Sequence, residues 1–218
     1  MDSTTERLSR TLWLGVGLVI VTLCITYLVS QLQPRKHPAP ILPVLGQVAD
    51  FTLTNQAGQA VTLADLRGKA WVADIIFTRC TGPCPRMTGQ MQSLQDSLIG
   101  DAAAKLVTLT TDPEYDSPNV LKKYAARFKA NEARWIFLTG TKRQIAGLAI
   151  DSLKLTAVEK KPEERTDADD LFIHSTIFVV VDKQARLRGV FQTGGDGVEW
   201  TTVQPAIVRA IRQLEREP

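Results

Sequence analysis

Histidine and cysteine, the residues that most often bind soft metals, are scarce in this sequence. The 218 residues include three cysteines and two histidines. Three cysteines are too few for a small domain held together by disulfides. Because Cys24 lies in an apolar N-terminal run, the remainder of the chain has only Cys80 and Cys84. A closed structural zinc site needs four ligands and would have to recruit carboxylates, so the sequence does not favour a zinc protein.

A strong excess of charge of either sign is also absent. The formal net charge is +3 and the isoelectric point is about 8.8. No dense run of lysine and arginine is interleaved with aromatic residues, so the sequence does not indicate a nucleic-acid-binding protein. Hydrophobic residues make up 44% of the chain and charged residues 22%. This composition allows one domain of ordinary size plus a short extra segment.

Charged residues are entirely missing from Leu12 to Ser30. As a helix, this segment would span roughly 28 Å, about the thickness of a hydrocarbon core. It is not followed by the A-x-A-like cleavage site that ends a secretory signal peptide. We interpret residues 1–11 as a cytoplasmic N-terminus and residues 12–30 as an uncleaved transmembrane signal anchor. The alternative, a buried core helix, is disfavoured because no polar stripe runs along the segment.

The charges that flank this segment do not decide its orientation. Two arginines precede it, and Arg35 and Lys36 follow it, so the positive-inside comparison is a tie. Residues 31–46 contain four prolines and are predicted to form a stiff, extended linker. His37 lies in this linker, where we expect it to be solvated.

The remainder of the chain, residues 47–218, alternates between strand-like and helix-like patterns. Two short β-like runs within residues 51–63 flank a turn and predict a hairpin. The strands predicted after it are residues 70–77, 105–110 and 134–138, and a second hairpin is predicted at residues 175–192. The helices predicted between and after them begin at residue 85 and span residues 118–129, 142–150 and 199–216. This order is typical of an α/β thioredoxin-like fold, here with an N-terminal β-hairpin and preceded by one transmembrane helix. Asp74 interrupts an otherwise apolar strand and would need a partner if it were buried.

The segment from Phe77 to Pro85 contains the reactive groups Cys80 and Cys84, at a corner that we expect to be exposed. Cys84 falls in the first turn of the predicted helix, where unpaired N–H groups and the helix dipole favour an anion. We therefore expect the pKa of its thiol to be lowered. A thiolate is both a nucleophile for disulfide exchange and a soft metal ligand. The C-x3-C spacing permits either chemistry, because residues four apart in a helix are close enough for a disulfide or for one shared ion.

His174 is the third candidate ligand. It lies just before a predicted strand, in a loop that a thioredoxin-like fold places beside the dithiol. Two thiolates and one imidazole form a three-ligand soft site that suits Cu(I). The alternative is a core or capping histidine satisfied by hydrogen bonds. Thioredoxin-type oxidoreductases have a cis-proline in this loop, but no proline lies between Pro162 and Pro205, which favours a ligand over a general oxidoreductase.

Asp112 and Asp116 follow the next predicted strand, at the same edge of the sheet as the dithiol. A carboxylate there could accept a hydrogen bond from His174 and so orient it as a ligand. The alternative is a turn followed by a helix cap, since Ser117 and Pro118 suit the N-cap and the first helical position.

Together these motifs resemble those of the Sco/SenC family. The matching residues are Phe77-Thr78-Arg79-Cys80-x3-Cys84-Pro85, Asp112-Pro113-x2-Asp116-x-Pro118 and His174-Ser175. The resemblance covers roughly residues 47–214. It implies a thioredoxin-like domain that is anchored by one helix and faces the periplasm or the mitochondrial intermembrane space. We favour a bacterial inner membrane with the domain in the periplasm, because Asp2 and Glu6 do not fit an acid-poor mitochondrial transit peptide. One departure is visible, because the family commonly has proline directly after the first cysteine, whereas this chain has Thr81 there and a proline at Pro83.

The resemblance also implies a function. Family members bind copper through two cysteines and a histidine, which correspond to Cys80, Cys84 and His174. They help to assemble the binuclear copper site of cytochrome c oxidase subunit II, by delivering copper, by reducing the cysteines of that site, or both. The expected partners are that subunit, or a similar copper oxidase subunit, and a chaperone that donates copper.

Two other functions remain open from the sequence. Cys80 and Cys84 alone would serve a metal-free thiol-disulfide oxidoreductase as its redox pair. The chain could also be a copper or redox sensor that binds a partner and catalyses no reaction. The sequence favours a metallochaperone over an enzyme, with thiol-disulfide reductase activity as an addition.

Overall fold

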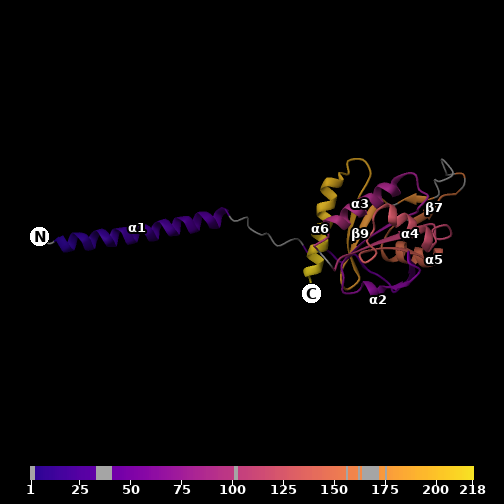
Figure 1. Cartoon of the computed structure of the whole chain (residues 1–218), viewed down its shortest axis with the longest axis horizontal. Helices are drawn as coiled ribbons and strands as arrows, with labels where there is room; N and C mark the ends of the chain where they lie inside the picture. The colour runs from indigo at the N-terminus through magenta and orange to yellow at the C-terminus, as the bar shows by residue number, and fades with distance from the viewer. Residues whose placement is uncertain are drawn as a thin grey trace. The chain divides into compact units, whose positions relative to one another are not determined.

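The computed structural model describes residues 3–32, 41–100, 103–155, 157–161, 163, 172–174 and 176–218 (Figure 1). For residues 3–12, 30–32, 157–159 and 172–174 it describes the backbone alone. The chain divides into two compact units, residues 1–40 and 41–218, and each unit is described by itself.

The first unit contains one long helix, α1 (Ser3–Leu32), which confirms that residues 12–30 are helical. Its described side chains, from Trp13 to Val29, are all exposed, and none of them is charged. Thr22 donates its hydroxyl to the carbonyl of Val19 (2.8 Å), so this polar group is satisfied within the helix. Across the residues that the structure describes, no helix combines the length and the apolar character that a membrane span needs. The predicted span itself is therefore not confirmed.

The second unit is built on an eight-stranded sheet with the order β1-β10-β9-β4-β5-β6-β2-β3. The three strands β4, β5 and β6 are parallel, and the other pairings are antiparallel. The bounds are β1 (Gly46–Gln47), β2 (Thr52–Asn55), β3 (Ala60–Thr62), β4 (Trp71–Ile76), β5 (Lys105–Thr110), β6 (Trp135–Thr139), β9 (Ile177–Val181) and β10 (Arg186–Gln192). The hairpins predicted at residues 51–63 and 175–192 are present as β2–β3 and β9–β10.

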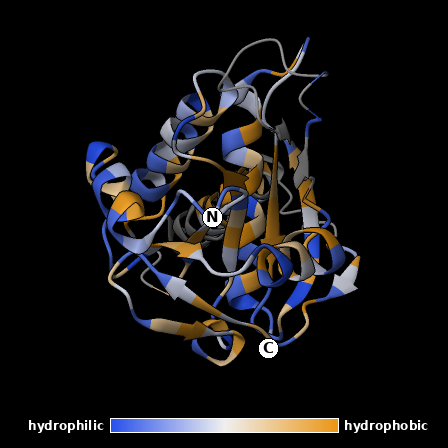
Figure 2. Cartoon of the chain, turned by 90° about the vertical axis from the view of Figure 1, so that its right-hand side faces the viewer, coloured by the Kyte–Doolittle hydropathy of each residue, from blue (hydrophilic) through white to orange (hydrophobic). Residues whose placement is uncertain are grey.

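Helices cover both faces of this sheet. Their bounds are α2 (Leu63–Leu66), α3 (Pro83–Ser97), α4 (Pro118–Arg127), α5 (Lys142–Ala146), the π-helix η1 (Gly147–Ser152) and α6 (Trp200–Arg216). Apolar side chains of α3, α4 and α6 share one core cluster, whereas those of α2, α5 and η1 share the other. Figure 2 shows the apolar colouring that runs along the central strands between these helices. A mixed sheet between two helical layers confirms the predicted α/β class.

Strand β4 explains how two cores form on one sheet. Successive side chains of a strand point to opposite faces, so Trp71 and Ile75 pack into one cluster, and Val72 and Ile76 pack into the other. All six residues of the strand are buried. By the same alternation, Asp74 faces the cluster that α3 covers.

A separate two-stranded sheet consists of β7 (Ala157–Glu159) and β8 (Phe172–His174), in which Ala157 is paired with His174. The sequence also predicts a charged, proline-containing insertion at residues 159–170, which begins at the end of β7. Apart from residues 159–161 and 163, it lies outside the described residues. The helix predicted at residues 142–150 begins as α5 and continues as η1, a change of helix type that the sequence pattern does not predict.

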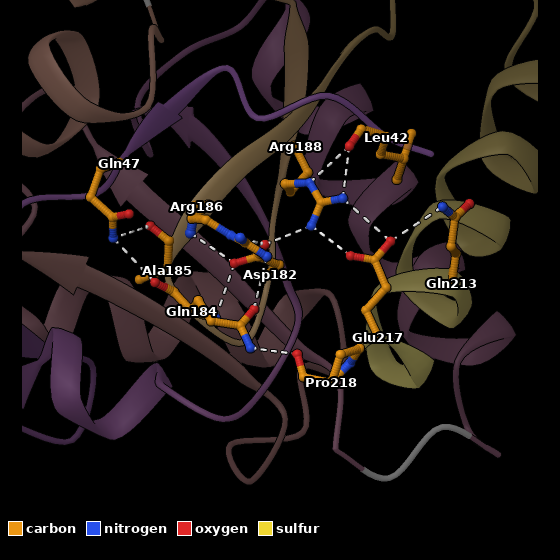
Figure 3. Close-up of polar contacts among 10 residues, drawn as sticks. All are labelled: Leu42, Gln47, Asp182, Gln184, Ala185, Arg186, Arg188, Gln213, Glu217 and Pro218. Atoms are coloured by element: carbon orange, nitrogen blue, oxygen red, sulfur yellow. Dashed lines mark hydrogen bonds and ion pairs between the residues drawn. The ribbon is translucent and has the colours of Figure 1, made fainter. Parts of the chain in front are cut away.

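A buried arginine joins the two ends of the second unit (Figure 3). Arg188 on β10 is 3% exposed and donates hydrogen bonds to the carbonyl oxygen of Leu42 (2.7 and 3.1 Å). It also donates to carboxylate oxygens of Asp182 and Glu217, both at 2.7 Å. The segment before β1, the turn after β9 and the residues after α6 therefore meet at one corner of the sheet.

Candidate dithiol and metal site

Cys80 and Cys84 lie where β4 is connected to α3. Strand β4 ends at Ile76 and the helix begins at Pro83. A proline suits this position because it lacks the N–H that the first turn of a helix leaves unpaired. Cys80 is 8% exposed and Cys84 is 0% exposed, and both belong to the core cluster that includes α3. The prediction of an exposed corner is therefore wrong for the two cysteines, of which only Cys80 reaches solvent at all.

The two thiols are not joined by a disulfide, and a hydrogen bond connects them. This hydrogen bond to Cys80, together with burial, raises the pKa of the Cys84 thiol far above its ordinary value. The prediction that the helix dipole lowers this pKa is wrong, because desolvation of a thiolate and competition with a second sulfur outweigh the helix terminus. Cys84 is thus the thiol that keeps its proton, and Cys80 is the thiol that solvent and reagents reach first.

Asp112 forms an ion pair with Arg79, the residue that precedes Cys80. Its Oδ2 atom lies 2.5 Å from Nη2 of Arg79, and the guanidinium group stacks on the ring of Tyr115 at 4.3 Å. The backbone N–H of Asp112 donates to the hydroxyl of Thr110 (3.0 Å). The ion pair joins the loop after β5 to the loop after β4, and so it holds the chain beside Cys80 in place.

Asp116 is fully buried and connects the ends of β4 and β5. It accepts hydrogen bonds from the N–H of Thr78 (3.1 Å), from the Thr78 hydroxyl and from the hydroxyl of Thr110 (2.5 Å). Burial raises the pKa of Asp116, an effect that these hydrogen bonds offset only in part. The structure thereby gives Asp116 a role in shaping the dithiol loop that the sequence did not predict.

The structure does not test the predicted contact of these two aspartates with His174. The backbone of His174 belongs to β8, but its side chain lies outside the described residues, as does all of His37. Among the side chains that the structure describes, no three from cysteine, histidine, aspartate and glutamate are grouped so that they could hold a metal ion. The ligand set of His174 and the two cysteines therefore stays a prediction.

Sequence reasoning missed the hydroxyl groups beneath Cys84. The hydroxyl of Thr88 donates to the carbonyl oxygen of Cys84 (2.9 Å), and it lies 3.0 Å from the hydroxyl of Tyr124. The spacing of four residues between Cys84 and Thr88 is visible in the sequence, because such residues are neighbours on a helix. The approach of Tyr124 from α4 is not visible, because it depends on how two helices pack on the same sheet.

Asp74 is the titratable group whose surroundings are most unusual. It is 0% exposed, and neither of its carboxyl oxygens has a hydrogen-bond partner among the described residues. Burial raises its pKa to about 7, an effect that the neighbouring Thr108 offsets only in part. The sequence indicated that Asp74 would need a partner if buried, and the described part of the structure provides none.

A parallel strand that ends just before a dithiol, and a helix that begins between the two cysteines, define this protein as a thioredoxin-like dithiol domain. A sequence model of the family described as SCO1/SenC matches residues 45–205. The chain therefore belongs to the SCO1/SenC family, which confirms the resemblance inferred from the motifs.

Individual relatives agree with this assignment. The chain is 37% identical over 147 residues to the SCO1 protein homolog of Bacillus subtilis, a match that covers 66% of this chain and 73% of that protein. It is similar to the structure of BsSco, a member of the Sco family of cytochrome c oxidase assembly proteins in which a disulfide switch was identified. That match has 30% identity and a TM-score of 0.67, and it covers 82% of this chain and 99% of the other. The chain also shares the fold of Bradyrhizobium japonicum ScoI with copper bound, at 22% identity and a TM-score of 0.63, over 77% of this chain and 99% of the other.

Proposed function

We propose that this chain binds copper through Cys80, Cys84 and His174. In this proposal it helps to assemble the binuclear copper site of cytochrome c oxidase subunit II or of a similar copper oxidase subunit. The observation that carries the proposal is the hydrogen-bonded pair of thiols at the connection from β4 to α3, because two sulfur atoms within hydrogen-bonding distance can share one ion. Further support comes from two relatives, BsSco, described as a cytochrome c oxidase assembly protein, and ScoI, solved with copper bound.

The surroundings of the two thiols suit a soft ion that is passed between proteins. Thiolates select Cu(I) over hard cations, and a bound metal displaces the thiol protons, which overcomes the raised pKa of Cys84. Cys84 lies inside the core, whereas Cys80 is partly accessible. A donor chaperone would therefore load the ion, and the oxidase subunit would remove it, from the side of Cys80.

Titration with Cu(I) tests the ligand set. The experiment uses the full chain with Cys24→Ser, in detergent and in competition with a chromogenic Cu(I) chelator. We expect one copper per chain, with binding at least about 100-fold weaker after Cys80→Ala, Cys84→Ala or His174→Ala, because each change removes a ligand and not merely a partner of a ligand. His37→Ala removes the other histidine and is the matched control, which should keep its affinity. Unchanged affinity in His174→Ala would exclude the three-ligand site.

A metal-free thiol-disulfide exchange is the second candidate, and the unequal exposure of Cys80 and Cys84 favours it. In such exchange an accessible thiol attacks a disulfide, and a second thiol resolves the mixed disulfide that results. The reduced chain should then reduce an oxidised copper domain of an oxidase subunit, His174→Ala should be fully active, and Cys84→Ser should be trapped as a mixed disulfide through Cys80. Loss of this activity in His174→Ala would contradict a metal-free reaction.

We propose in addition that α1 is a single-pass anchor in a bacterial inner membrane and that the second unit faces the periplasm. Support comes from the uncharged, exposed side chains between Trp13 and Val29, since an apolar helix needs either a core or a bilayer around it. In a bacterial host, the full chain should stay in the membrane fraction after a carbonate wash. Protease added to spheroplasts should remove the second unit. Release of the chain by carbonate, or protection from the protease, would contradict the proposal.

A further inference from the structure

A cleft of about 600 Å³ lies between the chain segment of residues 49–52, which leads into β2, and the helix formed by α5 and η1. Its apolar lining includes Leu148, which is 3% exposed, and the half-buried Phe51, and both pack in the core cluster of α2, α5 and η1. Cys80 and Cys84 belong to the other cluster. The sheet therefore separates this cleft from the dithiol. Its volume is in the range of clefts that bind ligands.

Two hydrogen bonds tie the walls of the cleft together at its two ends. The side-chain amide of Gln144 donates to the carbonyl oxygen of Thr52 (3.2 Å), and the backbone N–H of Ala49 donates to the hydroxyl of Ser152 (3.2 Å). Between them the helix has Gly147, where no other described segment lies within 4 Å of the place that a Cβ atom would take. The cleft is therefore fixed at both ends and open in the middle. One wall is a π-helix, a rare element that occurs frequently at functional sites.

The charges at the two ends of the cleft are opposite. Arg143 lies at one end, in the first turn of α5, and Asp151 lies at the other, in the last turn of η1. Neither side chain forms an ion pair or a hydrogen bond with another described residue. Asp50 adds a second carboxylate from the facing wall, and its partner is Arg67, at 3.8 Å and largely exposed. The cleft thus offers a cation at one end and carboxylates at the other to a ligand of complementary charge.

The separation of these charges selects the kind of ligand. Arg143 and Asp151 are eight residues apart, which at about 1.5 Å of rise per residue separates them by roughly 12 Å along the helix. A free amino acid is too short to reach both ends, because its two charges are separated by a single carbon atom. In an extended peptide, side chains i and i+4 point to the same side and lie roughly 13 Å apart, with side chain i+2 between them.

We propose that this cleft is a docking groove for an extended segment of a partner protein, with a basic, an apolar and an acidic residue at alternate positions. The acidic side chain lies next to Arg143 and the basic one next to Asp151. The apolar side chain fills the space beside Gly147. This inference goes beyond the proposed function and does not depend on it. Because the groove and the dithiol lie on opposite faces of the sheet, the partner can stay bound while Cys80 remains accessible.

Fluorescence anisotropy with labelled, end-blocked pentapeptides tests the groove on the full chain in detergent. The probes are Lys-Ser-Leu-Ser-Glu, the same sequence reversed, Lys-Ser-Leu-Ser-Lys and Glu-Ser-Leu-Ser-Glu. We expect saturable binding of at least one mixed-charge peptide. Both like-charge peptides should bind at least about fivefold more weakly, because one end of each meets a like charge. Equal binding of all four peptides, or no binding of either mixed-charge peptide, would overturn the proposal.

Gly147→Met tests the location of the groove. The residue has helical dihedral angles (φ −59°, ψ −42°) and open space around it, so a longer side chain should fill the groove without strain. Binding should weaken at least about 10-fold, because the new side chain takes the place of the peptide's leucine. Gly89→Met is the matched control, since Gly89 is also helical and equally open but lies on α3, on the other face. Equal binding by the two variants would show that the peptides do not occupy this cleft.

Arg143→Glu tests the charge pattern. The change makes both ends of the groove acidic, so the preference should move from the mixed-charge peptide to Lys-Ser-Leu-Ser-Lys. Lys142→Glu makes the same change of charge on the neighbouring residue, which does not line the cleft, and should keep the wild-type preference. An unchanged preference in Arg143→Glu would contradict the assignment of the two ends.

A last variant separates the groove from the proposed copper and thiol chemistry. Cys80→Ala should bind the mixed-charge peptide as the wild type does, whereas Gly147→Met should keep the copper binding of the wild type. Loss of peptide binding in Cys80→Ala would place the peptides at the dithiol and overturn the groove. Failure of the copper experiments would leave the peptide results unchanged, so the two proposals can fail separately.

Discussion

Two buried carboxylates on neighbouring strands of the same sheet behave in opposite ways. Asp182, directly after β9, is 1% exposed and accepts four hydrogen bonds, from the N–H groups of Gln184 and Arg186 and from the guanidinium groups of Arg186 and Arg188. Burial acts to raise its pKa, but these bonds outweigh burial, and the pKa is lowered. Asp74 on β4 is equally buried but has no partner among the described residues, and its pKa is raised to about 7.

The difference shows that partners, and not burial alone, decide the charge of an acid inside this domain. At the corner drawn in Figure 3, Asp182, whose pKa is lowered by its hydrogen bonds, helps to hold both ends of the second unit. Around Asp74, the lack of partners leaves a group whose charge changes near neutral pH, on the same face as the dithiol. The first region holds a carboxylate that stays charged at neutral pH, and the second holds an acid that titrates there.

Among the variants that test this comparison, Asp74→Asn should change the free energy of unfolding most. The pKa of Asp74 is raised from 3.8, its ordinary value, to about 7 in the folded chain, so the unfolded chain releases this proton at lower pH. Stability is therefore lost as pH rises from about 4 to about 7, by on the order of 4 kcal/mol. Asp74→Asn should remove this loss and be more stable than the wild type at pH 8. Urea unfolding at several pH values measures it, and identical pH slopes in the two proteins would contradict the raised pKa.

Arg188→Met should bring Asp182 only part of the way towards the state of Asp74, because the bonds from Gln184 and Arg186 remain. The change leaves Asp182 and Glu217 without their buried cation and should reduce the free energy of unfolding by about 3 kcal/mol. This value is at the low end for breaking a buried pair, because Glu217 is partly exposed. Urea unfolding at pH 7 is the measurement. The double variant Arg188→Met with Asp182→Asn should recover part of the stability, and no recovery would show that the charge of Asp182, which then has only Arg186 as a cation, is not the cause of the loss.

Arg79→Met tests a pair of intermediate burial. Arg79 is partly exposed whereas Asp112 is largely buried, so solvent screens one end of the interaction. We expect a loss of about 1 kcal/mol in the free energy of unfolding, between the values for surface and buried pairs. A loss as large as that of Arg188→Met would mean that the stacking of Arg79 on Tyr115 contributes more than the ion pair.

Arg67→Met should have the smallest effect. Arg67 and Asp50 are 3.8 Å apart, and both side chains are largely exposed. We expect a change below about 0.5 kcal/mol, and the variant is the matched surface control for Arg79→Met and Arg188→Met. A larger loss in the same urea unfolding measurement would show that the pair is linked to further interactions of the β2 region.

Much of the fold could be predicted because it depends on local patterns. The apolar run of β4, the proline at the start of α4 and the turn of the β2–β3 hairpin each identify an element without knowledge of its neighbours. The two-residue strand β1 and the change from α5 to η1 could not be predicted, because they depend on backbone contacts with distant parts of the chain. The thioredoxin-like fold and the SCO1/SenC family followed from the order of these elements and from the spacing of the motifs.

At the site, the identity of the reactive residues could be predicted but their electrostatics could not. The sequence predicted a lowered pKa for the Cys84 thiol, but the pKa is raised. The shift depends on the hydrogen bond to Cys80 and on burial beneath packed helices, which the sequence does not show. Arg79 and Thr78 contact Asp112 and Asp116 because β4 and β5, which lie far apart in sequence, are neighbours in the sheet. Asp74 was recognisable as an exception, since a single acid in an apolar strand is visible in the sequence, but its lack of partners was not.

The two hydrogen bonds from Arg188 to the backbone carbonyl of Leu42 have a mechanical consequence. The chain before Leu42 joins the second unit here, so tension applied from that side is felt at this point first. Arg188 transmits the load to Glu217, after α6, and to Asp182, after β9. Strand β4 lies two strands further into the sheet, so the loop of Cys80 is not on the direct line of force. We therefore expect a pull on the N-terminal side of the second unit to leave the pair of thiols undistorted.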